Sequence, residues 1–482
     1  MLLDLSRYTP SHRAELERLL ASDAWQRVLG SDLPARLADR RLTPPPTRGY
    51  TDTVVEQLTA LNDARVRRFV DEGCRDEDTL FETLARWPTD PGAQPLRLSF
   101  IGLNVTAHCN ISPRCAYCNQ PDTEERLGPA DWRRIVDEVS AANDGPGAYI
   151  YVTGGEPLLL KQDLWGPEGL VAYATARGNS VNINTNGTLI TPEVALQLVA
   201  AGTGRLHISL DSSDPAVQNQ LYGGNWFERI VQGIDHVQLA REMLGVTYPL
   251  IHLNTVLTRR NLERFPELFA FVLERHPQIS DRGHPLYTDL FPHVIPVGGS
   301  DEDEDDGLSP SAEEYLRFYR VIWPQVTALW RTYQERIGVP SAERAELPGN
   351  LLNPWARLQQ NGTLEEYCQL AEQGRQATLA FARHCYVAPT QATFAPDGEQ
   401  YRCGWHAIAR WLPVGDVRER SVTNSIRAGL DGLGALPWEQ YCAGCSLATL
   451  YINQQTEARL RAAVRAMLGE SDGSTPASVD PA

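Results

Sequence analysis

The chain has 482 residues and carries 44 Lys and Arg against 61 Asp and Glu, which gives a formal net charge of −17 at pH 7. This acidic balance argues against a protein that binds nucleic acid by neutralising phosphates. A hydrophobic fraction of 42% is typical of a globular protein with a large core. No apolar run is long enough to span a membrane, and residues 1–20 carry charge too early for a signal peptide, so we expect a cytoplasmic protein without a membrane partner.

Residues 1–94 are expected to form a helical N-terminal extension. Apolar residues recur at helical spacing over residues 13–29 and again over 54–68. Three consecutive prolines at 44–46 separate the two segments.

From about residue 96, short β-type runs alternate with helical segments. Six such runs and the helices between them predict an α/β fold with a parallel sheet over residues 95–300. The helix after the third run is clearly marked by Thr191 as N-cap, Pro192 at the first position and Gly202 just past its end. The runs cover 96–106, 148–153, 180–185, 205–211, 249–257 and 288–297.

Residues 301–382 are expected to be a helical linker segment that begins with a solvated loop at the acidic run 301–306. An apolar stripe at helical spacing follows, and it is typical of core packing rather than of a cofactor site. Its members are Tyr315, Phe318, Tyr319, Ile322, Val326, Leu329 and Trp330. Residues 459–482 are expected to be a helical end with a disordered tail.

The nine cysteines fall into two sets and two single residues. An odd number without an export signal argues against a disulfide framework. The first set is Cys109, Cys115 and Cys118, and the second is Cys385, Cys403, Cys442 and Cys445. Cys74 and Cys368 remain, and we interpret them as small apolar side chains or spare thiols.

The first cysteine set lies in a loop after the first strand, where three thiolates can hold one metal centre. The cysteine spacing alone does not distinguish two kinds of site. One is a zinc ion whose coordination is completed by a histidine such as His108, and the other is an iron–sulfur cluster with one iron free of protein ligands. The second strand favours the cluster because it ends in Gly154-Gly155-Glu156-Pro157. A glycine pair lets a ligand approach the backbone, and a carboxylate can accept hydrogen bonds from an ammonium group.

These motifs, with Asn184-Thr185-Asn186-Gly187 and Ile208-Ser209-Leu210-Asp211, resemble those of radical S-adenosylmethionine (SAM) enzymes in content and order. The resemblance covers residues 98–260. It implies a partial (β/α)6 TIM-type barrel in which Cys109, Cys115 and Cys118 hold a 4Fe-4S cluster. SAM would chelate the open iron and be cleaved by one electron to a 5′-deoxyadenosyl radical that abstracts a substrate hydrogen.

The resemblance also implies roles for the residues around SAM. Glu156, with the carbonyls of Gly154 and Gly155, would take the methionine ammonium, and Tyr117 would pack near the adenine. Ser209 and Asp211 share parity on the fourth strand, so they would face the barrel interior near the SAM carboxylate and ribose. For Asn184 and Asn186, capping of the strand end is as good an interpretation as ligand contact. Five residues lie between the first two cysteines, where the family commonly has three, which leaves the loop path open.

The second cysteine set, within residues 383–458, resembles the twitch domain, a shorter relative of the SPASM domain. A Pro-Asp-Gly turn at 396–398 predicts a hairpin that returns the chain to Cys403. Cysteine spacing alone favours a four-cysteine zinc site, but the barrel upstream favours an auxiliary 4Fe-4S cluster. With four thiolates and no open iron, this cluster would relay electrons or support the substrate pocket.

Substrate-binding residues are expected at the C-terminal ends of the barrel strands. The candidates are Lys161, His207, His252, Asn254, Asp289 and His293, of which Lys161, His207 and His252 are the catalytic candidates. For each of them a hydrogen-bonded packing role is the competing interpretation.

The sequence therefore predicts a radical SAM oxidoreductase with a helical N-terminal extension, a partial barrel and a C-terminal auxiliary iron–sulfur domain. Its cofactors would be SAM and two 4Fe-4S clusters, and its reductant a flavodoxin- or ferredoxin-type protein. The substrate would be a ribosomal peptide that is oxidised or crosslinked. A small metabolite such as an aminosugar or cyclitol is the alternative, and a non-enzymatic zinc scaffold is the rival from another class.

Overall fold

The centre of the fold is one mixed sheet. The structure is a computed structural model, and the strand order in its described part is β6-β5-β4-β3-β2-β1-β7-β8-β9. It describes residues 3, 5–6, 8–38, 40, 43–47, 49–87, 97–118, 120, 123, 126–143, 147–275, 286–292, 307–344, 362–375, 385–430, 436, 438–445 and 447–470.

Six parallel strands form the barrel part of this sheet, which confirms the predicted α/β class with a parallel sheet. Along β1 to β5, apolar residues that face the outer helices are buried, as Ile150 and Val152 are on the second strand. The strands are β1 (Phe100–Thr106), β2 (Tyr149–Gly154), β3 (Ser180–Thr185), β4 (Arg205–Ser209), β5 (Leu250–Leu257) and β6 (Leu286–Pro292).

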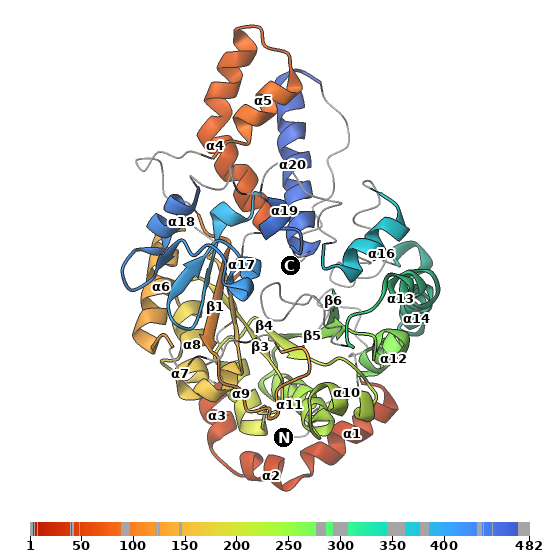
Figure 1. Ribbon diagram of the computed structural model, residues 1–482. Coiled ribbons are helices and arrows are strands. Elements are labelled where there is room, and N and C mark those ends of the chain that lie inside the picture. The colour runs from red at the N-terminus through yellow and green to blue at the C-terminus, as the bar shows by residue number, and fades with distance from the viewer. Residues whose placement is uncertain are drawn as a thin grey trace.

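Helices cover the outer face of these strands (Figure 1). The helix expected after the third strand is present, and the Thr191 hydroxyl accepts the amide of Val194 at its N-terminus. These helices are α6 (Pro129–Ala142), α7 (Gln162–Trp165), α8 (Leu170–Thr175), α9 (Pro192–Ala200), α10 (Pro215–Leu221), α11 (Phe227–Leu244) and α12 (Phe265–Arg275).

A group of helices after β6 packs on α12. The expected apolar stripe forms its core: Tyr315, Phe318 and Val326 are buried, and Leu329 is half-buried. Its elements are α13 (Ala312–Arg317), a π-helical turn (Phe318–Ile322), α14 (Trp323–Arg336) and α16 (Leu364–Glu372). The acidic run 301–306 lies outside the described residues.

The residues N-terminal to the barrel divide into two parts rather than forming one extension. One part, α1 to α3, packs beneath α9 and α11, and the other, α4 and α5, lies at the opposite end of the molecule (Figure 1). The helix expected over 13–29 is broken at Ala21 and Ser22, where Ser22 begins a new helix. The elements are α1 (Pro10–Leu20), α2 (Asp23–Leu29), α3 (Leu33–Ala38), α4 (Tyr50–Asp71) and α5 (Glu77–Leu84).

A three-helix lobe projects from the body where α4 and α5 pack against the C-terminal helix α20 (Leu447–Met467) (Figure 1). Its core contains Leu58, Phe81, Leu460 and Val464, all fully buried. The boundary expected at residue 458 therefore falls inside α20, because the helix continues across it to bury this apolar face. The tail after residue 470 lies outside the described residues.

The second cysteine set is joined to the barrel sheet rather than set apart from it. Strand β7 (Gln391–Phe394) pairs in parallel with β1, and β8 (Glu399–Tyr401) pairs antiparallel with β7, which confirms the expected hairpin. Gly398 has a φ of 97° at the turn. This arrangement covers the edge of β1 that the six-stranded part would leave unpaired. The remaining elements are α17 (Gly404–Ala409), β9 (Gly415–Asp416), α18 (Val422–Leu430) and α19 (Trp438–Tyr441).

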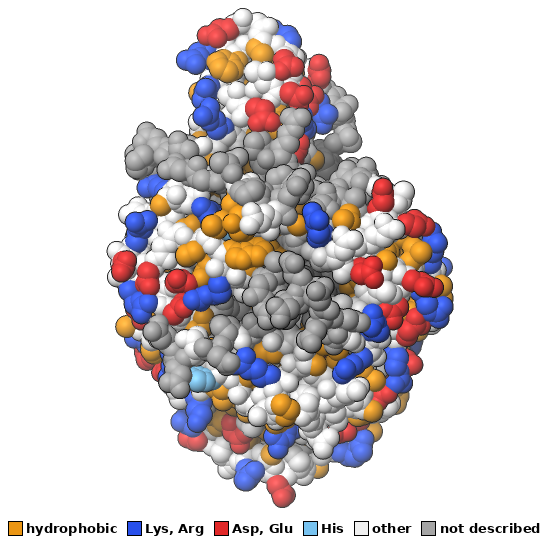
Figure 2. All heavy atoms as spheres, in the orientation of Figure 1, with side chains coloured by type: hydrophobic (Ala, Val, Ile, Leu, Met, Phe, Trp, Pro, Cys, Tyr) orange, Lys and Arg blue, Asp and Glu red, His pale blue; other side chains and the backbone are white. Residues whose placement is uncertain are grey.

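The surface carries no strongly one-sided charge on the visible face. Acidic and basic side chains are interspersed there, and hydrophobic side chains gather in a band below the projecting lobe (Figure 2). Within the described part of the chain, no helix is both long and apolar enough to cross a membrane.

The packing of α20 on the lobe gives a first prediction. We expect Leu460→Ala to lower the free energy of unfolding by about 2–5 kcal/mol, because it removes a fully buried side chain between α20, α4 and α5. Ala466→Gln, at an exposed position on the same helix, should change it by less than about 0.5 kcal/mol. Urea unfolding followed by circular dichroism measures both, and equal effects would contradict this packing.

Candidate functional site

The first cysteine loop follows β1 directly and contacts the end of α10. The amide of Ala116 donates to the carbonyl of Leu221 at 2.8 Å. Pro113 lies against Gly223, where a Cβ would come within 2.9 Å of the proline ring. The five-residue spacing between Cys109 and Cys115 thus carries the loop out to the α10–α11 connection. Cys109 and Cys118 are exposed, and Cys115 is half-buried.

The glycine pair after β2 is fixed to this loop by backbone hydrogen bonds. Gly155 donates to the carbonyl of Thr106 at 2.7 Å, and Glu156 donates to that of His108 at 2.8 Å. A Cβ on Gly155 would lie 2.1 Å from the His108 oxygen, and one on Gly154, whose φ is 126°, would lie 2.3 Å from the Thr106 oxygen. The glycines therefore allow the approach of the chain's own cysteine loop, where the sequence predicted the approach of a ligand.

Glu156 is completely buried and bridges the glycine turn to the end of β3. Its carboxylate accepts hydrogen bonds from the amide of Leu158 at 2.9 Å, the hydroxyl of Thr185 at 2.7 Å and the amide of Asn186 at 2.8 Å. Burial raises the pKa of Glu156 to about 7, against the opposing effect of these hydrogen bonds. The carboxylate of Glu156 thus holds the glycine turn against the end of β3, and its contact with an ammonium group stays a prediction.

Asn186, which Glu156 holds, reaches the cysteine loop. Its side-chain nitrogen lies 3.6 Å from the sulfur of Cys109 and 3.0 Å from the side-chain oxygen of Asn110. The backbone amide of Ile111 lies 3.4 Å from the same sulfur. The first cysteine is therefore held by donors from two directions.

Tyr117 and Asp211 tie the other side of the loop to the barrel. The Tyr117 hydroxyl donates to the Asp211 carboxylate, which also accepts the amide of Val256 at 2.8 Å. Asp211 is 2% exposed, and burial raises its pKa to about 6. Ser209 is half-buried at the end of β4, and its carbonyl accepts the hydroxyl of Tyr222 at 3.1 Å.

The three thiols lie within electrostatic reach of one another and of these carboxylates. Burial raises the pKa of Cys115, and the negative charges of Cys118 and Asp211 add to the rise. Burial also raises the pKa of Cys109, where Glu156 contributes. Deprotonated cysteines would therefore need a positively charged partner at this place.

Polar side chains line the inner face of the barrel next to the cysteine loop. Asn184 donates to the Thr153 hydroxyl at 3.3 Å, and Asn254 donates to the Asn184 oxygen at 3.0 Å. All three are half-buried, whereas Ile183 and Leu253 on the outer face are buried. The inner face at this end thus remains partly accessible and offers amides and hydroxyls.

Histidines and tyrosines lie closer to the N-terminal ends of the same strands. His207 and His252 are register partners on β4 and β5, with ring centroids 5.0 Å apart. His207 Nε2 lies 2.9 Å from the Tyr149 hydroxyl. Burial lowers the pKa of His207 well below its usual value, and His252 contributes to that decrease. The structure therefore brings two of the three expected catalytic candidates, His207 and His252, together.

Lys161 does not join this group. Its side chain is exposed, and its backbone has a φ of 51° where it begins α7. The side chain of Asp289 and all of His293 lie outside the described residues. His108 has an exposed side chain and contributes its carbonyl to the glycine turn.

The second cysteine set converges from three segments. Cys385 precedes the 3-10 turn before β7, Cys403 follows β8, and Cys442 and Cys445 lie between α19 and α20. Burial raises the pKa of Cys403 and of Cys442 to about 12 in each case, and the negative charge of Cys385 adds to both. The negative charges of the other three cysteines likewise add to the rise that burial causes in the pKa of Cys445.

One group of side chains has the geometry of a cation site. Among the described residues, ligand atoms of His12, Glu15 and Asp235 lie within 4.8 Å of one another, but Arg275 already pairs with Glu15 at 2.7 Å. For the two cysteine sets, the choice between zinc and an iron–sulfur cluster stays a prediction.

Comparison with known proteins places the barrel in a family. Residues 103–272 match the Radical SAM superfamily. These residues form a radical SAM domain. The cysteine loop, the glycine turn and strands β2 to β5 all lie within them.

Among curated proteins, the AdoMet-dependent heme synthase of Methanosarcina barkeri is 29% identical over 221 residues, which cover 45% of this chain and 56% of that protein. The mycofactocin maturase MftC of Mycobacterium tuberculosis is 29% identical over 196 residues, 39% of this chain and 47% of that one. The chain thus spans about half the length of these relatives. Among solved structures, SuiB of Streptococcus suis aligns over 81% of this chain and 82% of its own, with a TM-score of 0.47 and 14% identity.

Sequence reasoning missed several residues around the radical SAM domain. Tyr149 and Tyr151 alternate with Thr153 on β2, so strand parity could have placed them on the inner face. His406 lies three residues after Cys403, a helical spacing that could have been noticed. Tyr50, whose ring lies 5.9 Å from that of Phe100, comes from α4, and no sequence signal connects it with β1.

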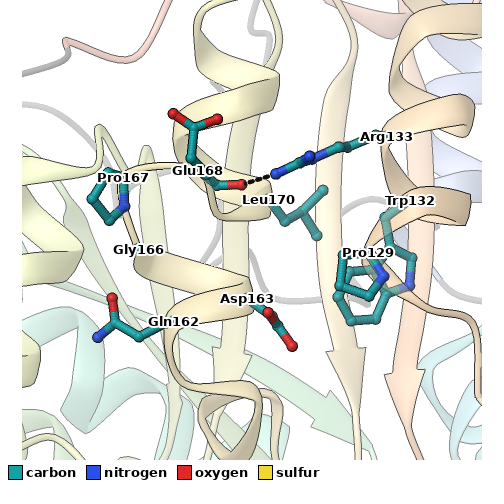
Figure 3. Close-up of a pocket in the computed structure, with 9 residues that line it drawn as sticks. All are labelled: Pro129, Trp132, Arg133, Gln162, Asp163, Gly166, Pro167, Glu168 and Leu170. Carbon is teal, nitrogen blue, oxygen red and sulfur yellow. Dashed lines mark hydrogen bonds between the residues drawn. The ribbon is translucent and has the colours of Figure 1, made fainter.

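A surface pocket of about 230 Å³ lies on the outside of the radical SAM domain, between α6 and the α7–α8 segment (Figure 3). Its charged side chains come from opposite walls, and none of its residues belongs to the predicted site. The lining residues are Pro129, Trp132, Arg133, Gln162, Asp163, Gly166, Pro167, Glu168 and Leu170.

The glycine turn gives a second prediction. We expect Gly155→Ala to lower the apparent unfolding temperature, because its Cβ would overlap the His108 carbonyl and a backbone atom cannot move aside cheaply. Gly128→Ala, whose Cβ would find its first neighbour at 3.9 Å, is the control and should resemble wild type. Differential scanning fluorimetry measures both, and a stable Gly155→Ala protein would contradict the close approach.

The buried carboxyl gives a third prediction, for the metal-free chain. Its pKa is about 7 when folded and near 4.5 when unfolded, so its protonated form is favoured by folding. The wild type should therefore lose about 3 kcal/mol of stability as pH rises from about 4.5 to about 7. Glu156→Gln removes this titration. Urea unfolding at several pH values should show the stability difference between the two proteins changing across that window, and parallel curves would contradict the buried state of Glu156.

Proposed function

We propose that the chain is a radical SAM oxidoreductase that removes a hydrogen atom from a substrate in the barrel. The observation that carries this proposal is the docking of a three-cysteine loop on the glycine turn, beside a partly accessible polar inner face. Its exposed Cys109 and Cys118 leave room for a centre at the mouth of the barrel. The superfamily match of residues 103–272 supports the same chemistry.

Cys109, Cys115 and Cys118 would hold a 4Fe-4S cluster. With SAM at its open iron, this group supplies one-electron cleavage of SAM to methionine and a hydrogen-abstracting 5′-deoxyadenosyl radical. The chain's own residues fix the loop that holds it: Asn186 donates toward Cys109, and Tyr117 is held by Asp211. Backbone carbonyls of the glycine turn are the remaining groups for the SAM ammonium, since the Glu156 carboxylate is buried. A flavodoxin- or ferredoxin-type protein would supply the electron.

The substrate would lie against the amides and hydroxyls of the inner face, with its reacting carbon toward the cysteine loop. We propose a peptide side chain as the substrate, which the maturase name of one relative supports. The hydrogen-bonding lining of Thr153, Asn184 and Asn254 also suits a small hydroxylated metabolite, which is the second candidate.

His207 is the proposed proton acceptor. Its lowered pKa keeps the ring neutral, and its Nε2 is hydrogen-bonded to the Tyr149 hydroxyl. The substrate would lose a hydrogen atom to the radical, then a proton to His207 and an electron to the auxiliary centre. The balance is a two-electron oxidation. His252 would act as a positioning residue through the ring contact with His207.

Cys385, Cys403, Cys442 and Cys445 would hold a second 4Fe-4S cluster. Four thiolates saturate such a centre, so it would accept the electron rather than bind substrate. The pairing of β7 with β1 places this set directly beside the barrel. Tyr50 lies between them, because the charges of Tyr149 and Cys403 both add to the rise that burial causes in its pKa.

Cysteine substitutions test the proposal. The anaerobically reconstituted wild type should bind about eight irons per chain and, with dithionite and SAM, should release 5′-deoxyadenosine. Replacing Cys109, Cys115 and Cys118 by alanine should leave about four irons and abolish that release. Replacing Cys442 and Cys445 should leave about four irons and retain uncoupled SAM cleavage. Iron and sulfide analysis with chromatography measures each outcome, and stoichiometric zinc without iron would contradict the proposal in favour of a zinc scaffold.

The substrate class is tested separately with deuterated candidates. Deuterium transferred into 5′-deoxyadenosine from a deuterated peptide side chain would support the peptide, and transfer only from a deuterated cyclitol or aminosugar would contradict it.

A further inference from the structure

A cluster on the second cysteine set would be harder to reduce than a cluster on the first set. Four thiolates make a cluster more negative by one charge than three thiolates do, and added negative charge lowers a reduction potential. The proposed function nevertheless requires the auxiliary centre to accept an electron. The surrounding residues therefore have to stabilise its reduced state.

His406, on α17, provides donors to two of the four cysteines. Its backbone amide donates to the sulfur of Cys403 at 3.4 Å, and its ring Nε2 lies 4.0 Å from the sulfur of Cys442. The side chain is 2% exposed.

Metal binding fixes the direction of the ring contact. A ligating cysteine sulfur has lost its proton, so a hydrogen bond between these two atoms requires the tautomer that carries its hydrogen on Nε2. A hydrogen bond to a cluster sulfur stabilises the more negative, reduced state and raises the potential. His406 is not needed as a ligand, because four cysteines already serve four irons.

Other donors surround the same set, and two of them come from α20. The hydroxyl of Thr449 opposes the rise that burial causes in the pKa of Cys445, and the side chain of Asn453 does the same for Cys385. Arg402, whose side chain donates to the carbonyl of Gly429 at 3.0 Å, places a half-buried positive charge near Cys403 and Cys442.

We propose that His406 is a positioning residue that raises the reduction potential of the auxiliary centre by donating its Nε2 hydrogen to Cys442. This inference rests on the proposed function, because it requires a cluster on the second cysteine set. It assigns part of the electron-accepting character of that centre to a side chain outside the ligand set.

The test uses the full-length chain with Cys109, Cys115 and Cys118 replaced by alanine, so that the auxiliary signal is observed alone. Dithionite titration monitored by electron paramagnetic resonance gives the potential of the one-electron reduction. His406→Ala should lower the reduced-to-oxidised ratio at a fixed potential about tenfold, which corresponds to about 59 mV. His406→Gln, which keeps a donor near the position of Nε2, should recover most of this shift.

Thr456→Val is the control, because Thr456 is buried on α20 and donates to the carbonyl of Ile452 at 2.8 Å, so the potential should not change. An unchanged potential in His406→Ala would overturn the inference. Strong nitrogen hyperfine coupling from His406 would also overturn it, since the ring would then be a ligand. A background protein that binds no iron would overturn the auxiliary cluster, and with it the electron-transfer part of the proposed function, but not the SAM cleavage assigned to the first cysteine set.

Discussion

The structure depends on the contact between the glycine turn at Gly154 and Gly155 and the loop that carries three cysteines. Two backbone hydrogen bonds, from Gly155 to Thr106 and from Glu156 to His108, hold the loop at the mouth of the barrel. They require that residues 154 and 155 have no Cβ. Glu156 then carries the constraint to the third strand, because its buried carboxylate binds Thr185 and Asn186, and Asn186 returns to Cys109. The loop, the turn and the strand ends therefore form one connected unit.

The C-terminal part of the chain is connected to the same unit through the sheet. Strand β7 pairs with β1, whose end leads into the first cysteine loop, so the two cysteine sets flank one strand. Helix α20 has two roles along its length: Thr449 and Asn453 face the second cysteine set, and Leu460 and Val464 face the lobe of α4 and α5. Helices α4 and α5 thus pack on the C-terminal part of the helix that carries Thr449 and Asn453.

Local patterns predicted the barrel well, because β-type runs, the Thr191 cap and the Pro-Asp-Gly hairpin depend on neighbouring residues. The division of residues 1–94 could not be predicted in this way, since α1 and α4 have similar amphipathic patterns and differ only in their distant partners. The surroundings of the Glu156 carboxylate could not be predicted either. A sequence shows that a carboxylate follows two glycines, but it does not show that three donors from β3 and the turn enclose it.

The central claim is that the cysteine loop holds an iron–sulfur cluster with one iron open to SAM. The most direct measurement is electron–nuclear double resonance of the reduced protein with SAM labelled with ¹⁵N in its methionine amine. Strong coupling between that nitrogen and the cluster is the result this account predicts. A reduced cluster that shows no coupling to the label, or coupling to a protein nitrogen at the same iron, would contradict it.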